Sequence, residues 1–439
     1  MTAIGFHSTR SGGGASAPDV TLGTAIARGL APDGGLYVPR RLPALDLAGL
    51  GELSRLPDIA ALALGGFFEG DALAPDVAAI TSAALDLPVP TTAVEGTDDA
   101  LFALELYHGP TAAFKDFGAR FLAETLERLE ARAASPLTIL VATSGDTGGA
   151  VAAAFHGRPW VRVVILYPKG LVSPRQEQQL TCWGDNIVSL RVDGTFDDCQ
   201  RMVKEAFVDA ELARRHRFSS ANSINIGRLL PQMTYYVASS LDVQRRTGAR
   251  ASFIIPAGNL GNAFAALWAR ALGLPIDRIV LAHNANRCVP DYLQTGRWEP
   301  RRSIPTLASA MDVGNPSNME RLRELVPTID AMRAALAAES VDDAAIAARI
   351  RADFARFGRI WCPHTATAAE VYARLAPAAR RAGPWVLVAT AHPAKFNEIV
   401  EPLIGASIAV PESLARLLAL PRRHVDVAPS LPALAAALE

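Results

Sequence analysis

From about residue 100 onward, short apolar segments alternate with helical ones, and this alternation restricts the fold more than any other feature of the chain. The apolar segments are rich in branched residues and carry almost no charge, which is typical of strands buried on both faces of a parallel sheet. Strands that alternate with helices indicate an α/β fold. We therefore predict buried parallel strands at residues 137–142, 161–167, 252–255, 279–283 and 385–389.

The length of the chain, 439 residues, exceeds what one ordinary hydrophobic core supports and predicts two or three domains. Residues 1–97 hold many Gly and Pro residues and only short apolar runs, so we interpret them as an N-terminal cap domain. Two α/β domains are predicted to follow, a smaller one at residues 98–225 and a larger one at residues 226–439.

Charge and composition exclude several classes of protein. The formal net charge is -1 with no block of like charges, which argues against a nucleic-acid partner or a basic membrane patch. The first ten residues do not resemble a signal peptide, and no later stretch predicts a membrane span. We therefore expect a cytoplasmic protein with small-molecule ligands. The 4 cysteines show no CxxC spacing and the 8 histidines no HxxxH pair, so we expect no metal.

Lys115 is a candidate imine-forming lysine. Apolar residues at helical spacing follow it, so the sequence predicts a helix that starts there. The first turn of a helix carries partial positive charge and disfavours an ammonium ion, and a lysine with a depressed pKa can attack a carbonyl group. The alternative is an ordinary solvated lysine, which is the common case.

Two glycine-rich turns run from a predicted strand directly into a helix. In the first, residues 143–149, small residues and hydroxyl groups can surround a carboxylate or phosphate, although such a cluster is often only a turn with a helix cap. In the second, residues 256–262, two glycines and the N-H groups of the helix start suit one small phosphate. This second turn lacks both the P-loop pattern and the three-glycine dinucleotide pattern.

Thr390 follows the last predicted strand, and ligands of open α/β sheets gather outside the carboxyl ends of strands. The alternative is a threonine that satisfies a local backbone group. An imine lysine, a phosphate site and a partner for a ring nitrogen are together what pyridoxal phosphate requires from its protein. The combination therefore favours a pyridoxal phosphate enzyme.

The chain also resembles the threonine synthase family, specifically the group without an N-terminal S-adenosylmethionine-sensing extension. The resemblance spans nearly the whole chain. It implies the tryptophan-synthase-β-like fold (fold type II) of pyridoxal phosphate enzymes, with the cofactor between two α/β domains. The matching segments are residues 8–10, 29–39, 108–116, 143–148, 173–174, 176–178, 222–225, 258–262, 363–366 and 390–396.

The resemblance implies roles for individual residues. Lys115 would form the Schiff base with the cofactor, and Thr390 would face its pyridine nitrogen. The neutral hydroxyl group of Thr390, in place of a carboxylate, would leave the ring less strongly protonated. The cofactor phosphate would be held by Gly258, Asn259, Leu260, Gly261 and Asn262.

Substrate groups are implied by the same resemblance. Asp146 departs from the asparagine that many relatives of the broader fold carry beside the cofactor's phenolic oxygen, which leaves its role open. The turn that would receive the substrate's α-carboxylate consists of Ser144, Gly145, Asp146 and Thr147. For a second phosphate site the candidates are Asn225, Arg228, Lys395, Ser8 and Arg10, and the sequence does not choose among them.

The implied reaction converts O-phospho-L-homoserine and water into L-threonine and phosphate by γ-elimination and β-hydration, with Lys115 moving protons. A threonine or serine dehydratase shares the lysine, the phosphate turn and the elimination chemistry, and a protein that binds pyridoxal phosphate without turnover is a second alternative. The context of Lys115 and the segment after Thr390 favour threonine synthase. We expect a monomer or homodimer.

Overall fold

Two sheets form the framework of the protein in a computed structural model, which describes residues 3–11, 18–97, 99–130 and 135–439. Every pairing in the two sheets is parallel except that between β3 and β4. The six-stranded sheet has the order β11 (Ala337–Ser340), β10 (Ile276–His283), β9 (Ala251–Pro256), β12 (Trp385–Ala389), β4 (Leu101–Glu105) and β3 (Thr91–Ala93). The five-stranded sheet has the order β13 (Val425–Val427), β7 (Ile187–Val192), β6 (Val161–Pro168), β5 (Leu137–Ala142) and β8 (Arg217–Ser220).

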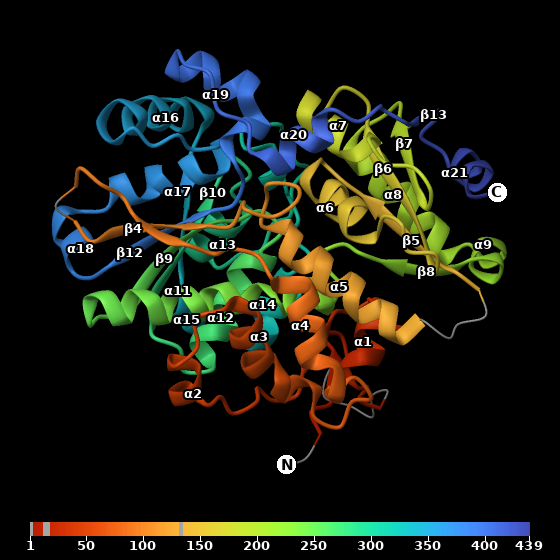
Figure 1. Cartoon of the computed structure of the whole chain (residues 1–439), viewed down its shortest axis with the longest axis horizontal. Helices are drawn as coiled ribbons and strands as arrows, with labels where there is room; N and C mark the ends of the chain where they lie inside the picture. The colour runs from red at the N-terminus through yellow and green to blue at the C-terminus, as the bar shows by residue number, and fades with distance from the viewer. Residues whose placement is uncertain (1–2, 12–17, 98, 131–134) are drawn as a thin grey trace.

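All five strands predicted from the apolar segments are confirmed, and each is a buried member of a parallel pair. In Figure 1 the six-stranded sheet lies on the left and the five-stranded sheet on the right. Within the described residues, no helix combines the length and the apolar character that a membrane span needs.

Helices flank both sheets, and further helices belong to the N-terminal segment (Figure 1). The N-terminal segment pairs β1 (Phe6–Ser8) with β2 (Tyr37–Pro39) and contains α1 (Leu22–Arg28), α2 (Leu47–Gly51), α3 (Leu56–Gly65) and α4 (Val77–Leu85). Helices that follow strands of the five-stranded sheet are α6 (Asp146–Phe155), α7 (Pro174–Thr181), α8 (Phe196–Val208) and α9 (Ala210–Arg215). Those around the six-stranded sheet include α11 (Gln232–Thr247), α12 (Gly261–Ala271), α13 (Cys288–Thr295), α14 (Met319–Leu325), α15 (Ile329–Ala335), α16 (Asp343–Phe357), α17 (Pro363–Arg374), α18 (Pro377–Arg381) and α19 (Asn397–Ile404). Near the C-terminus lie α20 (Glu412–Leu418) and α21 (Leu431–Leu438).

Strand pairing crosses both of the domain boundaries drawn from the sequence. β3 falls in the predicted cap segment 1–97 and β4 in the segment 98–225, yet both complete the six-stranded sheet, where β4 pairs with β12. β13 falls in the segment 226–439 but pairs with β7 of the five-stranded sheet. A short strand does not encode in its own residues which sheet edge it joins, because packing between distant segments decides the pairing.

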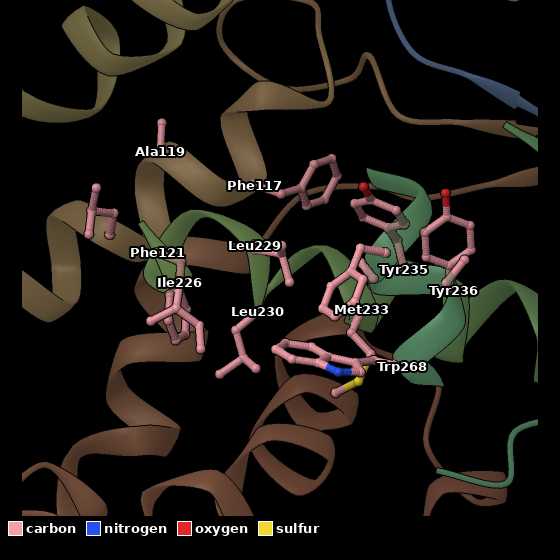
Figure 2. Close-up of a cluster of buried hydrophobic side chains, with 14 of the residues drawn as sticks. Phe117, Ala119, Phe121, Ile226, Leu229, Leu230, Met233, Tyr235, Tyr236 and Trp268 are labelled. Atoms are coloured by element: carbon pink, nitrogen blue, oxygen red, sulfur yellow. The ribbon is translucent and has the colours of Figure 1, made fainter. Parts of the chain in front are cut away.

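A buried cluster connects the helix that starts at Lys115 to the helix after the second glycine-rich turn (Figure 2). Phe117 and Phe121 of α5 (Lys115–Glu130) meet Leu229 of α10 (Ile226–Leu229), and Tyr235 of α11 and Trp268 of α12 close the cluster. Burying one such side chain contributes roughly 1.5 to 3 kcal/mol. This packing explains the apolar spacing in α5 and fixes its first residue relative to α12.

Candidate active site

The loop before α5 is held against the segment that follows β12. The Phe114 N-H donates to the carbonyl oxygen of Thr390 at 2.9 Å, and the His392 N-H donates to that of Ala112 at 3.0 Å. Ala112 has a positive φ of 54°, a conformation that L residues adopt rarely. Two segments far apart in the sequence therefore place Lys115 beside Thr390 at the carboxyl end of β12.

Asp116 closes the same loop. Its carboxylate accepts the backbone N-H of Thr111 at 2.9 Å and the Thr111 hydroxyl at 2.6 Å. Both residues are buried. The residue after the candidate lysine thus fixes the conformation of the loop before it.

Lys115 has the electrostatic surroundings of an activated amine. Burial, followed by the nearby guanidinium of Arg228, lowers the pKa of Lys115 to about 8, while the Asp146 carboxylate opposes the shift. The start of α5 adds its partial positive charge. A neutral amine is therefore far more accessible at Lys115 than in a solvated lysine.

The second glycine-rich turn forms a cup between β9 and α12, made of residues 258–262. Within the described part of the chain, no group accepts a hydrogen bond from the five backbone N-H groups of this cup. Leu260 caps the helix with a positive φ of 63°, a strained conformation that orients those N-H groups. A Cβ atom on Gly258 would lie 2.8 Å from the Cα of Met311, so only glycine fits there.

Asn262 offers one unused donor to the cup. Its Oδ1 accepts the hydroxyl groups of Tyr235 and Tyr236 at 2.5 and 2.8 Å, which fixes the amide orientation. Its Nδ2 is buried and has no acceptor among the residues that the structure describes. The side chain of Asn259, in contrast, is taken up by Ser223 and the backbone of Ser317.

The first glycine-rich turn leads into α6. The Thr143 hydroxyl accepts the N-H groups of Gly145 and Gly148 at 3.0 and 2.9 Å, so the turn does contain a helix cap. The N-H groups of Asp146 and Thr147 have no acceptor in the described residues. Two backbone donors of this turn thus remain available to an anion.

The Asp146 carboxylate is buried and paired. Its Oδ1 lies 2.8 Å from the Lys395 Nζ and accepts the Gln176 amide at 3.0 Å. Burial alone would raise the pKa of Asp146, but Lys395, His364 and the hydrogen bond from Gln176 together lower that pKa to about 2. Lys395 is fully buried and also donates to the carbonyl oxygen of Thr111 at 2.8 Å.

One cavity brings together many of the residues predicted from the sequence. Its walls include Lys115, Asp146, Thr390 and all of residues 258–262. The lysine, the cup and the strand-end hydroxyl therefore share one enclosed space, as pyridoxal phosphate requires.

Comparison with known proteins identifies the family. The family model described as "Threonine synthase N terminus" matches residues 5–85, "Pyridoxal-phosphate dependent enzyme" matches residues 87–391, and "Threonine synthase, C-terminal" matches residues 365–437. The threonine synthase of Haemophilus influenzae is 40% identical over 404 residues, which cover 92% of each chain. That of Escherichia coli is 39% identical over 404 residues, again 92% of each chain. The chain belongs to the threonine synthase family.

Solved threonine synthases have the same fold. The structure from Escherichia coli superposes with a TM-score of 0.88 at 36% identity, and the pyridoxal-phosphate-bound structure from Brucella melitensis with 0.90 at 32% identity. Each comparison covers 99% of both chains. The predicted fold type II and the predicted threonine synthase family are confirmed.

Pyridoxal phosphate, the cofactor of the threonine synthase family, fits the residues of the cavity. The free N-H groups of the cup and the orphaned Nδ2 of Asn262 provide phosphate donors at the positive end of α12. The amine of Lys115, with its lowered pKa, suits covalent attachment.

The remaining candidates from the sequence lie outside the walls of this threonine synthase cavity. Asn225 caps α10, and its amide nitrogen donates to two backbone carbonyl groups. Ser8 donates to an aspartate and Arg10 pairs with Glu320. Arg228 is buried behind Lys115, with its Nη2 3.5 Å from the Lys115 carbonyl oxygen. The other predicted site residues outside the cavity walls are Ser144, Gly145, Thr147 and Lys395.

Several cavity residues received no role from the sequence. Ser223 and His364 lie in segments that carried the threonine synthase resemblance, and this is the only signal that could have singled them out. Gln232 lines the cavity from the start of α11. Ala310 and Met311 belong to a 3-10 turn, η3 (Ser309–Met311), whose position depends on tertiary packing.

Proposed function

We propose that the cavity around Lys115 converts O-phospho-L-homoserine and water into L-threonine and phosphate. Membership of the threonine synthase family supports this reaction. The single observation that carries the proposal is that Lys115, with its pKa lowered to about 8, shares one cavity with the cup and with Thr390. Neither alternative from the sequence, a dehydratase or a binding protein without turnover, is favoured by these findings.

Bound pyridoxal phosphate supplies the electron sink that permits loss of protons from the substrate's α and β carbons. The cup and the Asn262 Nδ2 would hold the cofactor phosphate, and Thr390 would offer its hydroxyl group to the cofactor's ring nitrogen. Lys115 would hold the cofactor covalently and, as a free amine, would take the proton from the substrate's Cα. Loss of phosphate from Cγ, addition of water at Cβ and the return of protons to Cγ and Cα would complete the conversion.

The turn at residues 144–147 would receive the substrate's α-carboxylate through the N-H groups of Asp146 and Thr147. These two donors lie at the start of α6, where the helix favours an anion. The Asp146 carboxylate does not repel that anion strongly, because Lys395 neutralises it at 2.8 Å.

Of the candidates for the phosphate of the substrate, Arg228 is the buried cation that forms no ion pair in the described residues, although it lies outside the cavity walls. Its Nε has no acceptor in the described residues, but its Nη1 donates to the carbonyl oxygen of Ala221 and its Nη2 lies 3.5 Å from that of Lys115. Lys395 is occupied by Asp146 and by a backbone carbonyl group.

The proposal is tested with Lys115→Ala, using the exposed Lys169→Ala as the matched control. Borohydride reduction followed by peptide mapping identifies the lysine that carries pyridoxal phosphate, and phosphate release from O-phosphohomoserine measures turnover. We expect both signals to vanish in Lys115→Ala and to persist in the control. Covalent attachment at another lysine would refute the assignment, and threonine consumption without phosphate release would favour the dehydratase.

We further propose that the protein works in the cytoplasm as a monomer or homodimer, without a nucleic-acid partner. The net charge of -1 without charge blocks supports the absence of a nucleic-acid surface. Gel filtration with light scattering measures the oligomeric state.

A further inference from the structure

His364 is a buried histidine in the wall of the cavity. It is the second residue of α17, it is 3% exposed, and its ring packs on Phe396 with 4.9 Å between ring centroids. The ring Nε2 accepts the backbone N-H of Ala310 at 3.0 Å. The imidazole is therefore fixed both by packing and by a hydrogen bond from η3.

The bond to Ala310 assigns the tautomer of His364. A backbone N-H can only donate, so Nε2 must offer its lone pair and the neutral ring must carry its proton on Nδ1. Burial lowers the pKa of His364 to about 4, with Lys395 and Lys115 acting in the same direction and Asp146 opposing them. The ring is thus neutral at pH 7, with a single N-H donor at Nδ1.

That donor has no partner among the described residues. The Nδ1 of His364 is buried, and no acceptor lies within hydrogen-bond distance of it in the described part of the chain. Buried N-H groups are almost always paired, so an orphan calls for an explanation. The nearby Asp146 carboxylate pairs through its Oδ1 with Lys395 and Gln176, and it forms no hydrogen bond with the His364 Nδ1.

We propose that His364 is a ligand-binding residue whose Nδ1-H donates to an oxygen atom of the molecule bound in the cavity. The inference rests on the proposed function of the cavity, because it assigns a further contact within it. A neutral donor aligns an anionic oxygen without adding a charge or a transferable proton beside Lys115. The acceptor oxygen belongs either to the cofactor or to the amino-acid substrate, and the experiment separates these two sources.

Two variants divide the functions of the ring. In His364→Gln the side-chain Oε1 can still accept the Ala310 N-H, but the donor at the Nδ1 position is lost. In His364→Asn an amide N-H can occupy the Nδ1 position, but the acceptor for Ala310 is lost. We expect His364→Gln to weaken binding about tenfold or more and His364→Asn to stay within a few-fold of the wild type.

Two measurements locate the acceptor. Fluorescence titration of the cofactor-free protein gives the affinity for pyridoxal phosphate, and steady-state assays at saturating cofactor give KM and kcat for O-phosphohomoserine. A loss in the titration assigns the bond to a cofactor oxygen, whereas a raised KM with unchanged cofactor affinity assigns it to a substrate oxygen. Unchanged values in His364→Gln, or equal losses in both variants, would overturn the proposal.

A spectroscopic measurement keeps the test independent of whether the variants fold. In wild-type protein with ¹⁵N-labelled histidine, the Nδ1-H signal of a neutral ring is expected to move downfield when pyridoxal phosphate, alone or with substrate, fills the cavity. If no imidazole N-H signal moves in either case, the proposal is wrong. Because Lys115→Ala abolishes turnover without removing His364, failure of the proposed function and failure of this inference are distinguishable.

Discussion

Replacing Lys395 by Met tests whether the buried ion pair beside the cavity is essential for stability. Lys395 lies in η4 (Pro393–Phe396), after β12 of the six-stranded sheet, and Asp146 starts α6, after β5 of the five-stranded sheet. The ammonium group is 2.8 Å from Asp146 and 2.8 Å from the carbonyl oxygen of Thr111. The variant keeps much of the apolar stem, so it removes the charge and the donors with little change of volume.

The expected cost follows from the fate of Asp146. At 2.8 Å and an effective dielectric constant near 20, the attraction is roughly 6 kcal/mol before desolvation is subtracted. Removing one partner of a buried pair typically costs about 3 to 5 kcal/mol, because the other charge stays buried without compensation. We expect a loss of that size for Lys395→Met and a comparable one for Asp146→Asn. The double variant has no unpaired charge and should lose much less than the sum.

The effect should depend on pH with a defined sign. In the wild type the pKa of Asp146 is lowered to about 2 from 3.8, so the stabilisation that it provides is present above pH 4 and is lost as the pH falls toward 2. Without Lys395, burial dominates and raises that pKa above 3.8, so the variant is penalised increasingly as the pH rises. The stability gap between variant and wild type should therefore narrow from pH 8 to pH 5.

The double-variant cycle is measured by urea unfolding of the wild type, both single variants and the double variant, at pH 8 and at pH 5. Unfolding midpoints are compared only where the dependence of the unfolding free energy on urea concentration is the same. The reasoning is refuted if the two single losses add in the double variant. It is also refuted if the stability gap between Lys395→Met and the wild type widens at pH 5.

Three further predictions concern the cup and the histidine. Gly258→Ala places a Cβ 2.8 Å from the Cα of Met311 and should lower the affinity for pyridoxal phosphate about tenfold. The nearest atom to a Cβ on Gly261 would lie 3.6 Å away, so Gly261→Ala should keep the stability of the wild type in urea. Tyr236→Phe removes one of two hydroxyl donors to the cup's amide, at a cost of about 1 kcal/mol, or roughly fivefold in cofactor affinity by titration. The pKa of His364 is lowered to about 4 from 6.5, so between these values only the unfolded state takes up the proton; stability should fall by about 3 kcal/mol as the pH drops from 6.5 to 4, and urea unfolding of His364→Phe should lack this dependence.

Local chemistry explains what could be predicted from the sequence. The five buried strands, the helix that begins at Lys115 and the cup at residues 258–262 are each encoded within a few consecutive residues, through branched apolar runs, helical spacing and glycine. The sequence also indicates the turn at residues 143–149 but leaves open whether it binds an anion or is only a turn with a helix cap; in the structure the Thr143 hydroxyl accepts the N-H groups of Gly145 and Gly148. Short-range patterns thus located the loops of the site.

Pairing between distant residues could not be predicted. The sequence offers Lys395 as a candidate for phosphate binding, yet in the structure Lys395 pairs with Asp146. No local sequence pattern around either residue predicts that pairing. His364 receives its hydrogen bond from Ala310 across a separation of 54 residues. The strand β4 joins β12 for the same reason, since sheet membership is decided by tertiary packing.

The distribution of charge around the cavity accounts for an aspartate, rather than an asparagine, at position 146. Lys115, Arg228 and Lys395 are three cations in and beside the cavity; Asp146 pairs directly with Lys395 and also acts on Lys115, while the buried Asp116 acts on Arg228 and Lys395. Of the three cations, Lys115 lines the cavity. An asparagine at 146 would remove the direct ion-pair partner of Lys395, which is fully buried, and leave the Thr111 carbonyl oxygen and the charge of Asp116 as its compensation. Asp146 therefore limits the positive charge of the empty cavity while keeping Lys395 charged, and the double-variant cycle measures this balance directly.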